Sequence, residues 1–289
     1  MNVTSSNAIL PLPGTDSGTG FAGALITGSD SISSTRRSIA PAARCTSPHC
    51  SVSDMPELAR NSVNKRKSLI SQEKTLSKKL ILVEKPLFTK NEKLSIKKNK
   101  VFVGYNMRFN PLIQFIKKKI KNKKIWSINI FCGSYLPNWR PNRDYKSTVS
   151  AKRKLGGGVI LDLSHELDYT QWLLGNIKIE NVISKKLSNL KINTDDFLSI
   201  SGKTNRSIRV QIDLNYFTKK PTRRIIIDGK NISIDADLIE KKIFFSEGEN
   251  NGIFSKKSLH KNHTYENMHR SLLKKDFKVC CSYKEGKNL

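Results

Sequence analysis

The stretch that decides the fold is GGGVILDLSHELDYTQWLLG, residues 156–175. Three glycines open it, apolar residues then recur at helical spacing, and Gly175 closes it, so the pattern predicts one helix. Gly156–Gly158 permit either a tight entry turn or the close approach of the backbone to a flat ligand. The stretch is therefore both a fold signal and a candidate site.

Two ionisable side chains lie within this predicted helix. Asp162 and His165 are three residues apart, a spacing that places both on one helix face. Asp162 can orient the imidazole or stabilise its charge, and a histidine near its reference pKa suits proton transfer at neutral pH. The alternative is a half-buried structural histidine, with Asp168 as a surface acid.

The sequence after Gly175 consists of short apolar runs separated by turn residues. The predicted strands are IENVISKKL, FLSISGKT, SIRVQIDLNYF, RRIIIDG, NISIDAD and KKIFFSEG, at 179–187, 197–204, 207–217, 223–229, 231–237 and 241–248. A final helix is predicted over HTYENMHRSLLKKDF, residues 263–277. Strands in succession, with one helix before and one after, indicate an antiparallel α+β layer.

Upstream of the glycines, strand and helix patterns alternate. Strands are predicted over 79–88, 100–109 and 125–135, and helices over 89–99 and 110–122. The first strand ends in Glu84-Lys85-Pro86, and ligands of doubly wound sheets gather at the carboxyl ends of strands. A lysine before a proline at that point directs a cation into the crevice. The alternative is an ordinary surface lysine at a strand end.

Residues 1–60 differ in composition from the rest of the chain. They contain eleven serines and no lysine, and their four basic and four acidic residues cancel. Such a segment cannot bury enough apolar surface to offset the entropy of ordering, which predicts a mobile segment. Gly18, Gly20 and Gly23 within it have dinucleotide-binding spacing, but prolines rather than a strand precede them. No acidic residue follows at about 20 positions either, so we interpret the match as an accident.

The formal charge of +28 comes entirely from residues 61–289. Lysines are spread through a background rich in Asn and Ile, which favours solvated faces over a dedicated polyanion site. The densest run, KKKIKNKK at 117–124, has no interleaved aromatic residues on which bases would stack. A nucleic-acid-binding module is the weaker alternative.

The remaining motifs exclude several classes of protein. No segment approaches the roughly 18 apolar residues of a membrane helix, and no secretory signal is recognisable. Cys45, His49 and Cys50 lack a second ligand pair at zinc spacing, so no metal site is predicted. The five cysteines, which form no disulfide framework and favour a reducing cytoplasm, are Cys45, Cys50, Cys132, Cys280 and Cys281.

Four separated motifs resemble the Gfo/Idh/MocA oxidoreductases and occur in that family's order. They are EKPLF at 84–88, VGYNMRFNP at 103–111, NWRP at 138–141 and the helix stretch at 156–175. The C-terminal HTYENMHRSLL and SYKEGK also look like the family's closing helices, so the resemblance covers about residues 79–288.

This resemblance implies an α/β plus α+β fold. A remnant of a Rossmann dinucleotide-binding domain precedes an open, mainly antiparallel sheet covered by helices. The implied parts are an atypical, disordered or non-native segment at 1–78, the last Rossmann strands at 79–110, and a substrate and oligomerisation domain at 111–289.

The resemblance also implies chemistry, namely hydride transfer between NAD or NADP and a sugar or polyol. Lys85 would lie between the nicotinamide ribose and the substrate, and His165 would take the hydroxyl proton with Asp162 in support. Further implied roles are cofactor contacts for Glu84, Lys85, Pro86, Trp139 and Arg140, and substrate contacts for Tyr105, Asn106, Arg108 and His165. The exposed sheet face would pair subunits into dimers or tetramers.

Two departures from the family's pattern qualify this reading. Asp162 and His165 are three residues apart, whereas many members have four. Residues 1–60 supply none of the family's first Rossmann strands or its glycine loop. We therefore hypothesise that the N-terminal segment does not belong to the fold, which calls cofactor binding into question. The alternative function is a non-catalytic, truncated remnant of such an enzyme.

Overall fold

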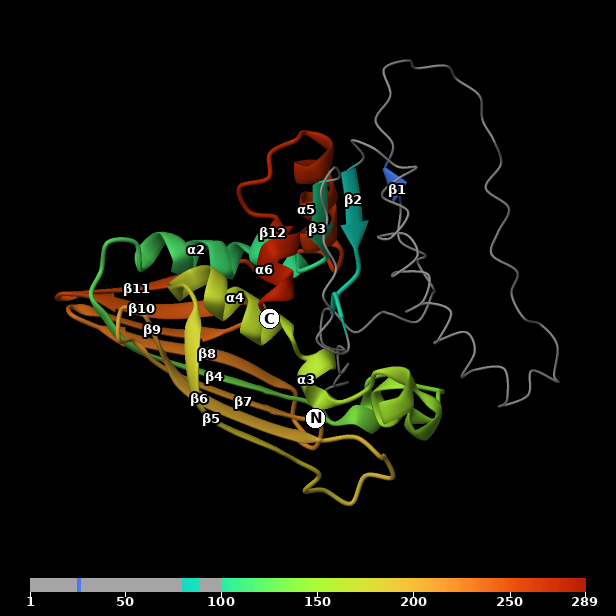
Figure 1. Cartoon of the computed structure of the whole chain (residues 1–289). Coiled ribbons are helices and arrows are strands. Elements are labelled where there is room, and N and C mark those ends of the chain that lie inside the picture. Colours follow the sequence, from blue (N-terminus) through green and yellow to red (C-terminus); the bar gives the residue numbers. More distant parts are fainter. Residues whose placement is uncertain (1–24, 27–79, 89–99) are drawn as a thin grey trace, which may run out of the picture.

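The computed structural model describes residues 25–26, 80–88 and 100–289. The glycine match at 18–23, the Cys45–Cys50 group and the predicted helix at 89–99 therefore lie outside the described residues. The described part of the chain consists of two sheets with helices packed against them and several short turns (Figure 1).

The larger sheet has the strand order β11-β10-β9-β8-β4-β7-β6-β5. Its neighbours pair antiparallel except β4 and β7, which run parallel. The strands are β4 (Ile125–Gly133), β5 (Ile177–Lys185), β6 (Phe197–Thr204), β7 (Arg209–Asn215), β8 (Thr222–Gly229), β9 (Ile232–Asp237), β10 (Lys242–Glu247) and β11 (Asn250–Ser255). The predicted open, mainly antiparallel sheet is confirmed, and β11 is an additional strand.

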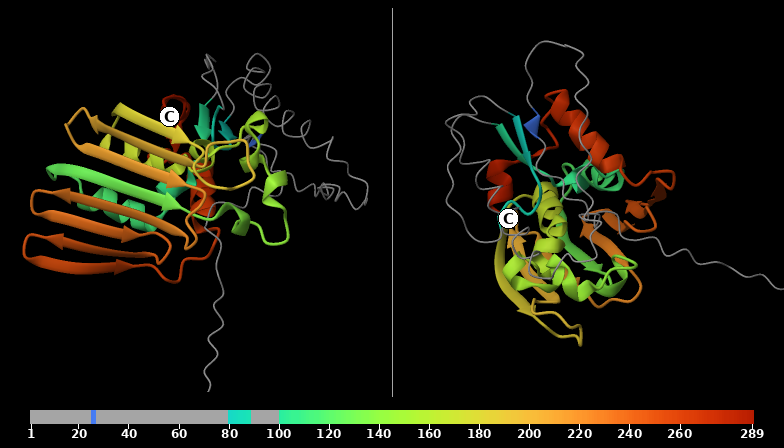
Figure 2. Two further views of the ribbon diagram at one scale, coloured as in Figure 1. Left: turned by 90° about the horizontal axis from the view of Figure 1, so that it is seen from below. Right: turned by 90° about the vertical axis from the view of Figure 1, so that its right-hand side faces the viewer.

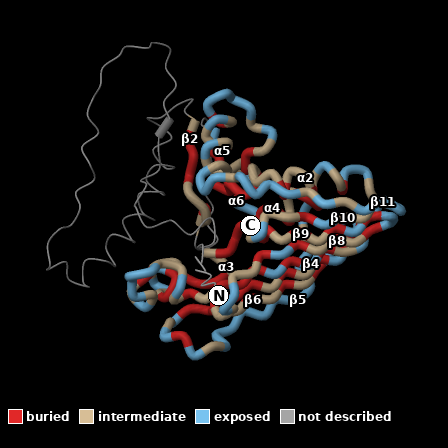
Figure 3. The backbone as a smooth tube through the Cα atoms, turned by 180° about the vertical axis from the view of Figure 1, so that it is seen from behind, coloured by how far each residue is buried: buried red, intermediate tan, exposed pale blue. Residues whose placement is uncertain are grey.

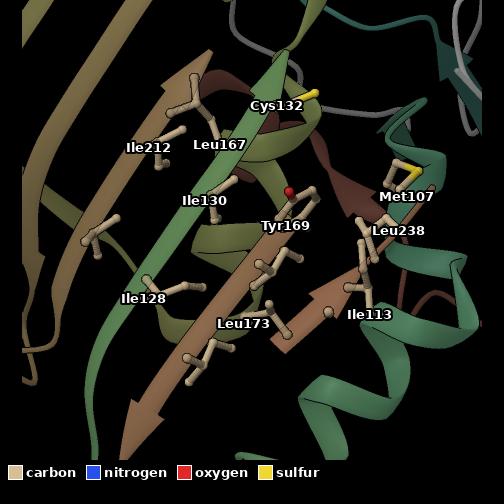
Figure 4. Packing of buried hydrophobic residues seen from close by; sticks show 14 of the residues in the cluster. Met107, Ile113, Ile128, Ile130, Cys132, Leu167, Tyr169, Leu173, Ile212 and Leu238 are labelled. Atoms are coloured by element: carbon tan, nitrogen blue, oxygen red, sulfur yellow. The ribbon is translucent and has the colours of Figure 1, made fainter. Parts of the chain in front are cut away.

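One face of this sheet carries the main core. Along β6 and β8 every second residue is buried, as expected where one side of a strand packs inward. Helices α2 (Pro111–Lys119) and α4 (His165–Leu174) cover that face (Figures 1 and 2). Figure 4 shows Ile128 and Ile130 of β4 among the side chains of this core.

The opposite face of the sheet is open. Trp126 on β4 is 55% exposed and Phe244 on β10 is 49% exposed. Polar cross-strand contacts separate these apolar residues, including an ion pair between Arg224 and Asp235 at 2.5 Å. The alternation of buried and exposed residues on the strands is visible in Figure 3.

The smaller sheet has the order β1-β2-β3-β12. Strands β2 (Leu80–Val83) and β3 (Lys100–Val103) run parallel, as in the end of a doubly wound sheet. The two-residue β1 (Leu25–Ile26) pairs antiparallel with β2, and β12 (Cys281–Ser282) pairs antiparallel with β3.

The chain end returns to this small sheet. Helix α5 (His263–Leu273) packs Met268 and Leu272 against Leu82 and Phe102, and α6 (Tyr283–Lys287) follows β12. Ser282 and Glu285 form a capping box at the start of α6. Both predicted closing helices are therefore present, although α5 ends four residues before the predicted limit of 277.

Short 3₁₀ turns occupy several segments that the sequence pattern did not resolve. The strand predicted over 100–109 stops at Val103, and its second half forms η2. The turns are η2 (Asn106–Phe109), η3 (Leu136–Asn138), η4 (Tyr145–Ser147), η5 (Val149–Ala151) and η6 (Arg153–Leu155).

The deciding stretch differs from its prediction in one respect: it forms two helices. Helix α3 (Val159–Asp162) ends at Leu163, whose φ of −99° and ψ of 27° depart from helical values, and α4 begins at His165. The apolar spacing continues through this break, which is why periodicity alone predicted one helix.

The three glycines make the tight entry turn rather than an approach for a ligand. A Cβ atom on Gly157 would lie 2.0 Å from the carbonyl oxygen of Val149, so protein backbone already fills that space. Gly158 has a φ of +131°, which favours glycine, and its Cβ would lie 2.8 Å from an Asp195 carboxylate oxygen. The same carboxylate accepts the Val159 N–H at 3.0 Å and caps α3.

Within the described residues, the helices are all too short or too polar to span a bilayer.

Candidate active site

Lys85 connects the small sheet to the helix that follows the glycine turn. Strand β2 ends at Val83, and the Lys85 ammonium donates to the backbone carbonyl of Asp162 at 2.5 Å. Burial lowers the pKa of Lys85, while the negative charges of Asp162 and Glu166 oppose that change. The sequence-predicted strand-end lysine therefore reaches the same region as the Asp162–His165 segment.

His165 lies almost fully inside the protein, with 4% of its surface exposed. The Tyr105 ring meets it edge-on at 5.6 Å between centroids. Neither imidazole nitrogen has a hydrogen-bond partner among the described residues. A buried imidazole with two unmatched nitrogens is the kind of group that a polar ligand would complete.

The expectation that His165 has a pKa near its reference value is wrong. Burial holds its pKa well below 6.5, and the positive charges of Lys85 and Arg223 lower it further. The imidazole is therefore neutral at pH 7, with one nitrogen available as a proton acceptor. The half-buried alternative is also corrected, since the side chain is buried.

Asp162 serves Lys85 and a tyrosine rather than the imidazole. Its carboxylate accepts a hydrogen bond from the Tyr216 hydroxyl at 2.5 Å, and its carbonyl accepts from Lys85. Because both His165 nitrogens lack partners, no Asp162–His165 hydrogen bond is present. The break between α3 and α4 separates the two residues that the single-helix prediction placed on one face.

Tyr216 is the residue that sequence reasoning missed. It follows β7, is fully buried, and lies 54 positions from Asp162 in the chain, so no local spacing could indicate the contact. Burial raises the pKa of its phenol, as does the nearby Asp162 carboxylate.

Trp139 supports Tyr216 from the other side. The two rings meet edge-on at 5.2 Å between centroids, and the indole N–H of Trp139 donates to Ser134 Oγ at 2.6 Å. Arg140 lines a small hollow with Trp139 and Tyr145. The NWRP motif thus lies next to the Asp162–Tyr216 contact.

A buried ion pair that the sequence did not reveal lies on the sheet side of His165. Arg223 Nε is 2.6 Å from Glu166 Oε1, and the exposed fractions of the two residues are 4% and 0%. Arg223 raises the positive potential at His165, whereas Glu166 raises the pKa of Lys85. This pair therefore acts on both groups of the candidate site.

Arg108 and Asn106 hold elements together instead of pointing free donors at the site. Arg108 pairs with Asp168 at 2.7 Å and with Glu285 at 2.8 Å, and Asn106 Nδ2 donates to Thr264 Oγ1 at 2.8 Å. These contacts join η2 to α4, α5 and α6.

The interpretation of Asp168 as a surface acid is wrong, because it is fully buried against Arg108. Burial raises the pKa of Asp168 to about 6, and the hydrogen bonds and charge of Arg108 oppose that rise.

The dense lysine run at 117–124 is used within the protein's own surface. Lys117 lies over the Trp172 ring at 3.8 Å, and Lys119 and Lys123 both pair with Glu247, at 2.8 and 2.6 Å. These contacts favour the interpretation of the run as a solvated structural face.

The described residues include a strand end and a buried imidazole that a ligand could complete. Glu84, Lys85 and Pro86 lie at the carboxyl end of a parallel strand, where doubly wound sheets receive ligands, and the orphaned His165 nitrogens suit a polar substrate. The glycines at 18–23 lie outside the described part of the chain. Among residues 80–88 and 100–289, no group of three or more His, Cys, Asp or Glu has metal-site geometry.

Comparison with known proteins places this arrangement in context. Residues 113–235 match the family model described as GFO/IDH/MocA C-terminal domain. A comparison with curated proteins gives no match.

Among solved structures, a levoglucosan dehydrogenase in complex with NADH superimposes with a TM-score of 0.61 at 15% identity, over 81% of this chain and 71% of that one. The WlbA dehydrogenase from Bordetella pertussis, in complex with NADH and UDP-GlcNAcA, gives 0.55 at 16% identity over 81% and 70%. An inositol dehydrogenase homolog from Azotobacter vinelandii, complexed with NAD+, gives 0.58 at 12% identity over 81% and 70%. At these identities the likeness concerns the fold.

Proposed function

We propose that this chain, which carries a C-terminal domain of the Gfo/Idh/MocA family, is an oxidoreductase that moves hydride between NAD(P) and a hydroxyl or carbonyl of a sugar. The observation that carries the proposal is His165, buried beside Lys85 with both ring nitrogens unmatched. Such a neutral imidazole is the group that a reacting hydroxyl would complete.

The proton steps follow from the charges around the imidazole. In the oxidation direction the substrate hydroxyl donates its proton to His165, which begins neutral because burial depresses its pKa. The Lys85 ammonium stabilises the developing alkoxide charge. Bound NAD(P) supplies the hydride acceptor at the nicotinamide. In the reverse direction His165 returns the proton to the alkoxide oxygen, so proton and hydride balance.

Asp162 and Tyr216 position the lysine in this mechanism. The Asp162 carbonyl fixes the Lys85 ammonium, and Tyr216 anchors the Asp162 carboxylate at 2.5 Å. Asp162 thus acts through Lys85, and its carboxylate also favours the charged form of that lysine.

We assign the cofactor contacts to the strand end and to the segment that packs beside it. Glu84, Lys85 and Pro86 would contact the nicotinamide half, and Trp139 and Arg140 would approach it from the larger sheet. Tyr105 would contact the substrate beside His165. Arg108 and Asn106 are assigned to the same wall, where Arg108 pairs with Asp168 and Asn106 donates to Thr264.

The substrate class is a sugar or sugar derivative. Solved structures of similar fold include a levoglucosan dehydrogenase and a dehydrogenase in complex with UDP-GlcNAcA. Several hydroxyl groups in a sugar would suit a site in which a buried imidazole and an ammonium lie side by side.

We further propose that the open sheet face forms a homo-oligomer. Trp126 and Phe131 on β4 expose 55% and 37% of their surfaces on the face opposite to α2 and α4. Large apolar side chains at the centre of an exposed face are typical of a protein interface.

The buried free thiols Cys132, Cys280 and Cys281 support a reducing cytoplasm as the setting.

The second candidate is a remnant that keeps the fold but binds no cofactor. It is favoured by the sequence of residues 1–60, which has eleven serines, no lysine and no strand pattern before Gly18. Both candidates share the Lys85–His165 site and differ in whether the chain binds a dinucleotide.

A titration with NADH and NADPH by calorimetry separates the two candidates. Saturable binding in the micromolar range supports the oxidoreductase, whereas no binding up to millimolar concentrations by a folded protein supports the remnant. The His165→Gln variant is the control, because it should bind the dinucleotide as the unchanged protein does while losing turnover of sugar substrates. Loss of dinucleotide binding in that variant would contradict the role assigned to His165.

A further inference from the structure

A hollow lined by lysines lies beside the segment that leads into the glycine turn. Its cavity volume is about 560 Å³, within the range of small-molecule sites. Two segments form it, one from η4 to Lys152 and the other the β5–β6 loop at 186–193. The lining residues are Lys146, Ala151, Lys152, Lys186, Ser188, Asn189, Leu190, Lys191, Ile192 and Asn193.

The charges around this lysine hollow are strongly one-sided. Four lysines and two asparagines line it, and no acidic residue does so among the described residues. Lys146 lies 3.7 Å from the Asp144 carboxylate, which offsets its charge, so the uncompensated positive charge comes from the other three lysines. Lys152 and Lys191 have no ion-pair partner within the described part of the chain.

The backbone that carries these lysines is held in place before any ligand arrives. The buried Asp196 carboxylate accepts the N–H groups of Leu187 and Ser188 at 2.7 and 3.1 Å, which fixes the start of the loop. The Lys191 N–H donates to the Tyr145 hydroxyl at 3.1 Å, which joins the loop to η4. Because this backbone is already fixed, it does not have to be ordered when an anion binds, which lowers the entropy cost of binding.

Two further bonds attach the end of the loop to η5. The Asn193 N–H donates to the Ala151 carbonyl at 3.1 Å, and the Thr194 hydroxyl donates to the Ser150 carbonyl at 2.9 Å. The same segment leads directly to Asp195, which caps α3. The hollow is thus built on the elements that position Asp162.

We propose that the lysine hollow binds the phosphate groups of a small phosphorylated ligand, and that these belong to the non-reacting end of the sugar substrate. Ammonium groups bind phosphate oxygens as point charges and suit a di- or polyanion better than a neutral sugar. The second half of the proposal rests on the proposed function, whereas the first half concerns the hollow alone.

The chemistry favours a small ligand over a nucleic acid. The lysines line one open hollow, and none of its lining residues is an aromatic residue on which a base could stack. Lys186 also donates to the Ser188 carbonyl at 2.7 Å, so its ammonium is tied to the rim of the loop.

The test uses inorganic pyrophosphate as the probe and the full chain as the protein. Calorimetry should give saturable binding that the double variant Lys152→Ala/Lys191→Ala weakens by at least about ten-fold, since each lysine contributes a charge-assisted contact. The matched control is Lys230→Ala/Lys257→Ala, which removes the same charge from exposed lysines outside the hollow. This control should change affinity by less than about two-fold.

Equal weakening in both double variants would overturn the proposal, because it would mean that pyrophosphate senses only the net charge. Tighter binding of a single-stranded oligonucleotide that the hollow variants abolish would likewise overturn it in favour of a nucleic-acid site. Circular dichroism of both variants confirms that they are folded before the titrations.

A second arm distinguishes the hollow from the proposed reaction. A nucleoside diphosphate sugar and the corresponding free sugar are compared as substrates in the presence of NAD or NADP. Preference for the diphosphate sugar, lost in the hollow variants through a raised KM, supports the substrate role. Specific pyrophosphate binding without turnover of either sugar would uphold the hollow and overturn its substrate role.

Discussion

Helix α4 carries two buried ionisable residues three positions apart that the protein treats in opposite ways. Asp168 is fully buried with its carboxylate matched to Arg108 at 2.7 Å, whereas His165 is buried with both ring nitrogens unmatched. Burial is therefore the same and hydrogen-bond satisfaction differs. The matched Asp168 joins structural elements, and we infer that the unmatched His165 marks the place for a ligand.

The largest effect on stability is expected from removing the cation that pairs with Asp168. The Arg108→Met variant leaves Asp168 buried without its cation, which should lower the free energy of unfolding by about 3–5 kcal/mol. Urea denaturation measures this loss. The double variant Arg108→Met/Asp168→Leu should recover most of it, and a single variant as stable as the unchanged protein would contradict the assigned role.

Replacing His165 should lower turnover and leave the free energy of unfolding nearly unchanged. The His165→Gln variant removes the proposed proton acceptor, which should lower kcat by about 10²–10⁴-fold. Because no hydrogen-bond partner of His165 is lost, the free energy of unfolding should change by less than about 1 kcal/mol. A loss of stability comparable to that of Arg108→Met would erase the distinction between the two residues.

Two fully buried tyrosines extend the comparison, and the expected loss of stability is of intermediate size. Tyr216 donates to the Asp162 carboxylate at 2.5 Å, whereas Tyr169 is 3.5 Å from Glu166 Oε1. The Tyr216→Phe variant should lose about 1.5–3 kcal/mol of stability, as a hydrogen bond to a charged group does. The Tyr169→Phe variant is the matched control and should lose clearly less. Thermal or urea unfolding of both variants decides the point, and equal losses would refute the special role of Tyr216.

The pH dependence tests the neutral state of His165. Its folded pKa lies well below 6.5, so oxidation should persist at neutral pH and decline only as acid protonates the imidazole. The unfolded histidine takes up a proton near pH 6.5, so this group also lowers stability as pH falls below that value.

Removing a neighbouring charge should move the titration of His165 in a defined direction. The Lys85→Met variant loses a cation that depresses the imidazole pKa, which should therefore rise towards its ordinary value. NMR of ring-labelled histidine follows the shift directly, without any substrate. A pKa that stays in place or falls would show that Lys85 does not act on the imidazole.

The smallest effect on stability is expected on the open face of the large sheet. The Trp126→Gln variant should change the free energy of unfolding of the subunit by less than about 0.5 kcal/mol, because the side chain is 55% exposed. Light scattering coupled to size exclusion should nevertheless show a smaller assembly. An unchanged assembly would exclude Trp126 from the subunit interface.

Much of the fold was predictable because periodicity is a local signal. Alternating burial along β6 and β8 matches the alternating sequence that predicted them. The break at Leu163 was not predictable, since apolar spacing continues across it. The strand β11, with the sequence NNGIFS, contains asparagines and a glycine that disfavour a strand and forms through pairing with β10.

The candidate site was predictable only where its residues lie close in sequence or at a strand end. Asp162 and His165 were found by spacing, and Lys85 by its position after a strand. Tyr216 and Arg223 make their contacts with partners 54 and 57 positions away, so only the folded arrangement reveals them. The burial of Asp168 has the same origin, because its cation lies 60 positions upstream.

The strand order of the large sheet also has a consequence for folding during synthesis. Strand β4 ends at residue 133, yet its two neighbours, β7 and β8, begin at residues 209 and 222. The central strand therefore emerges from the ribosome with both edges unpaired, and it can pair only after β7 and β8 have been synthesised. Its pairing with β7 is parallel and distant in sequence, the kind of contact that slows folding. A nascent chain that stalls before residue 209 would present an apolar strand, IWSINIFCG, to chaperones and to other nascent copies of itself.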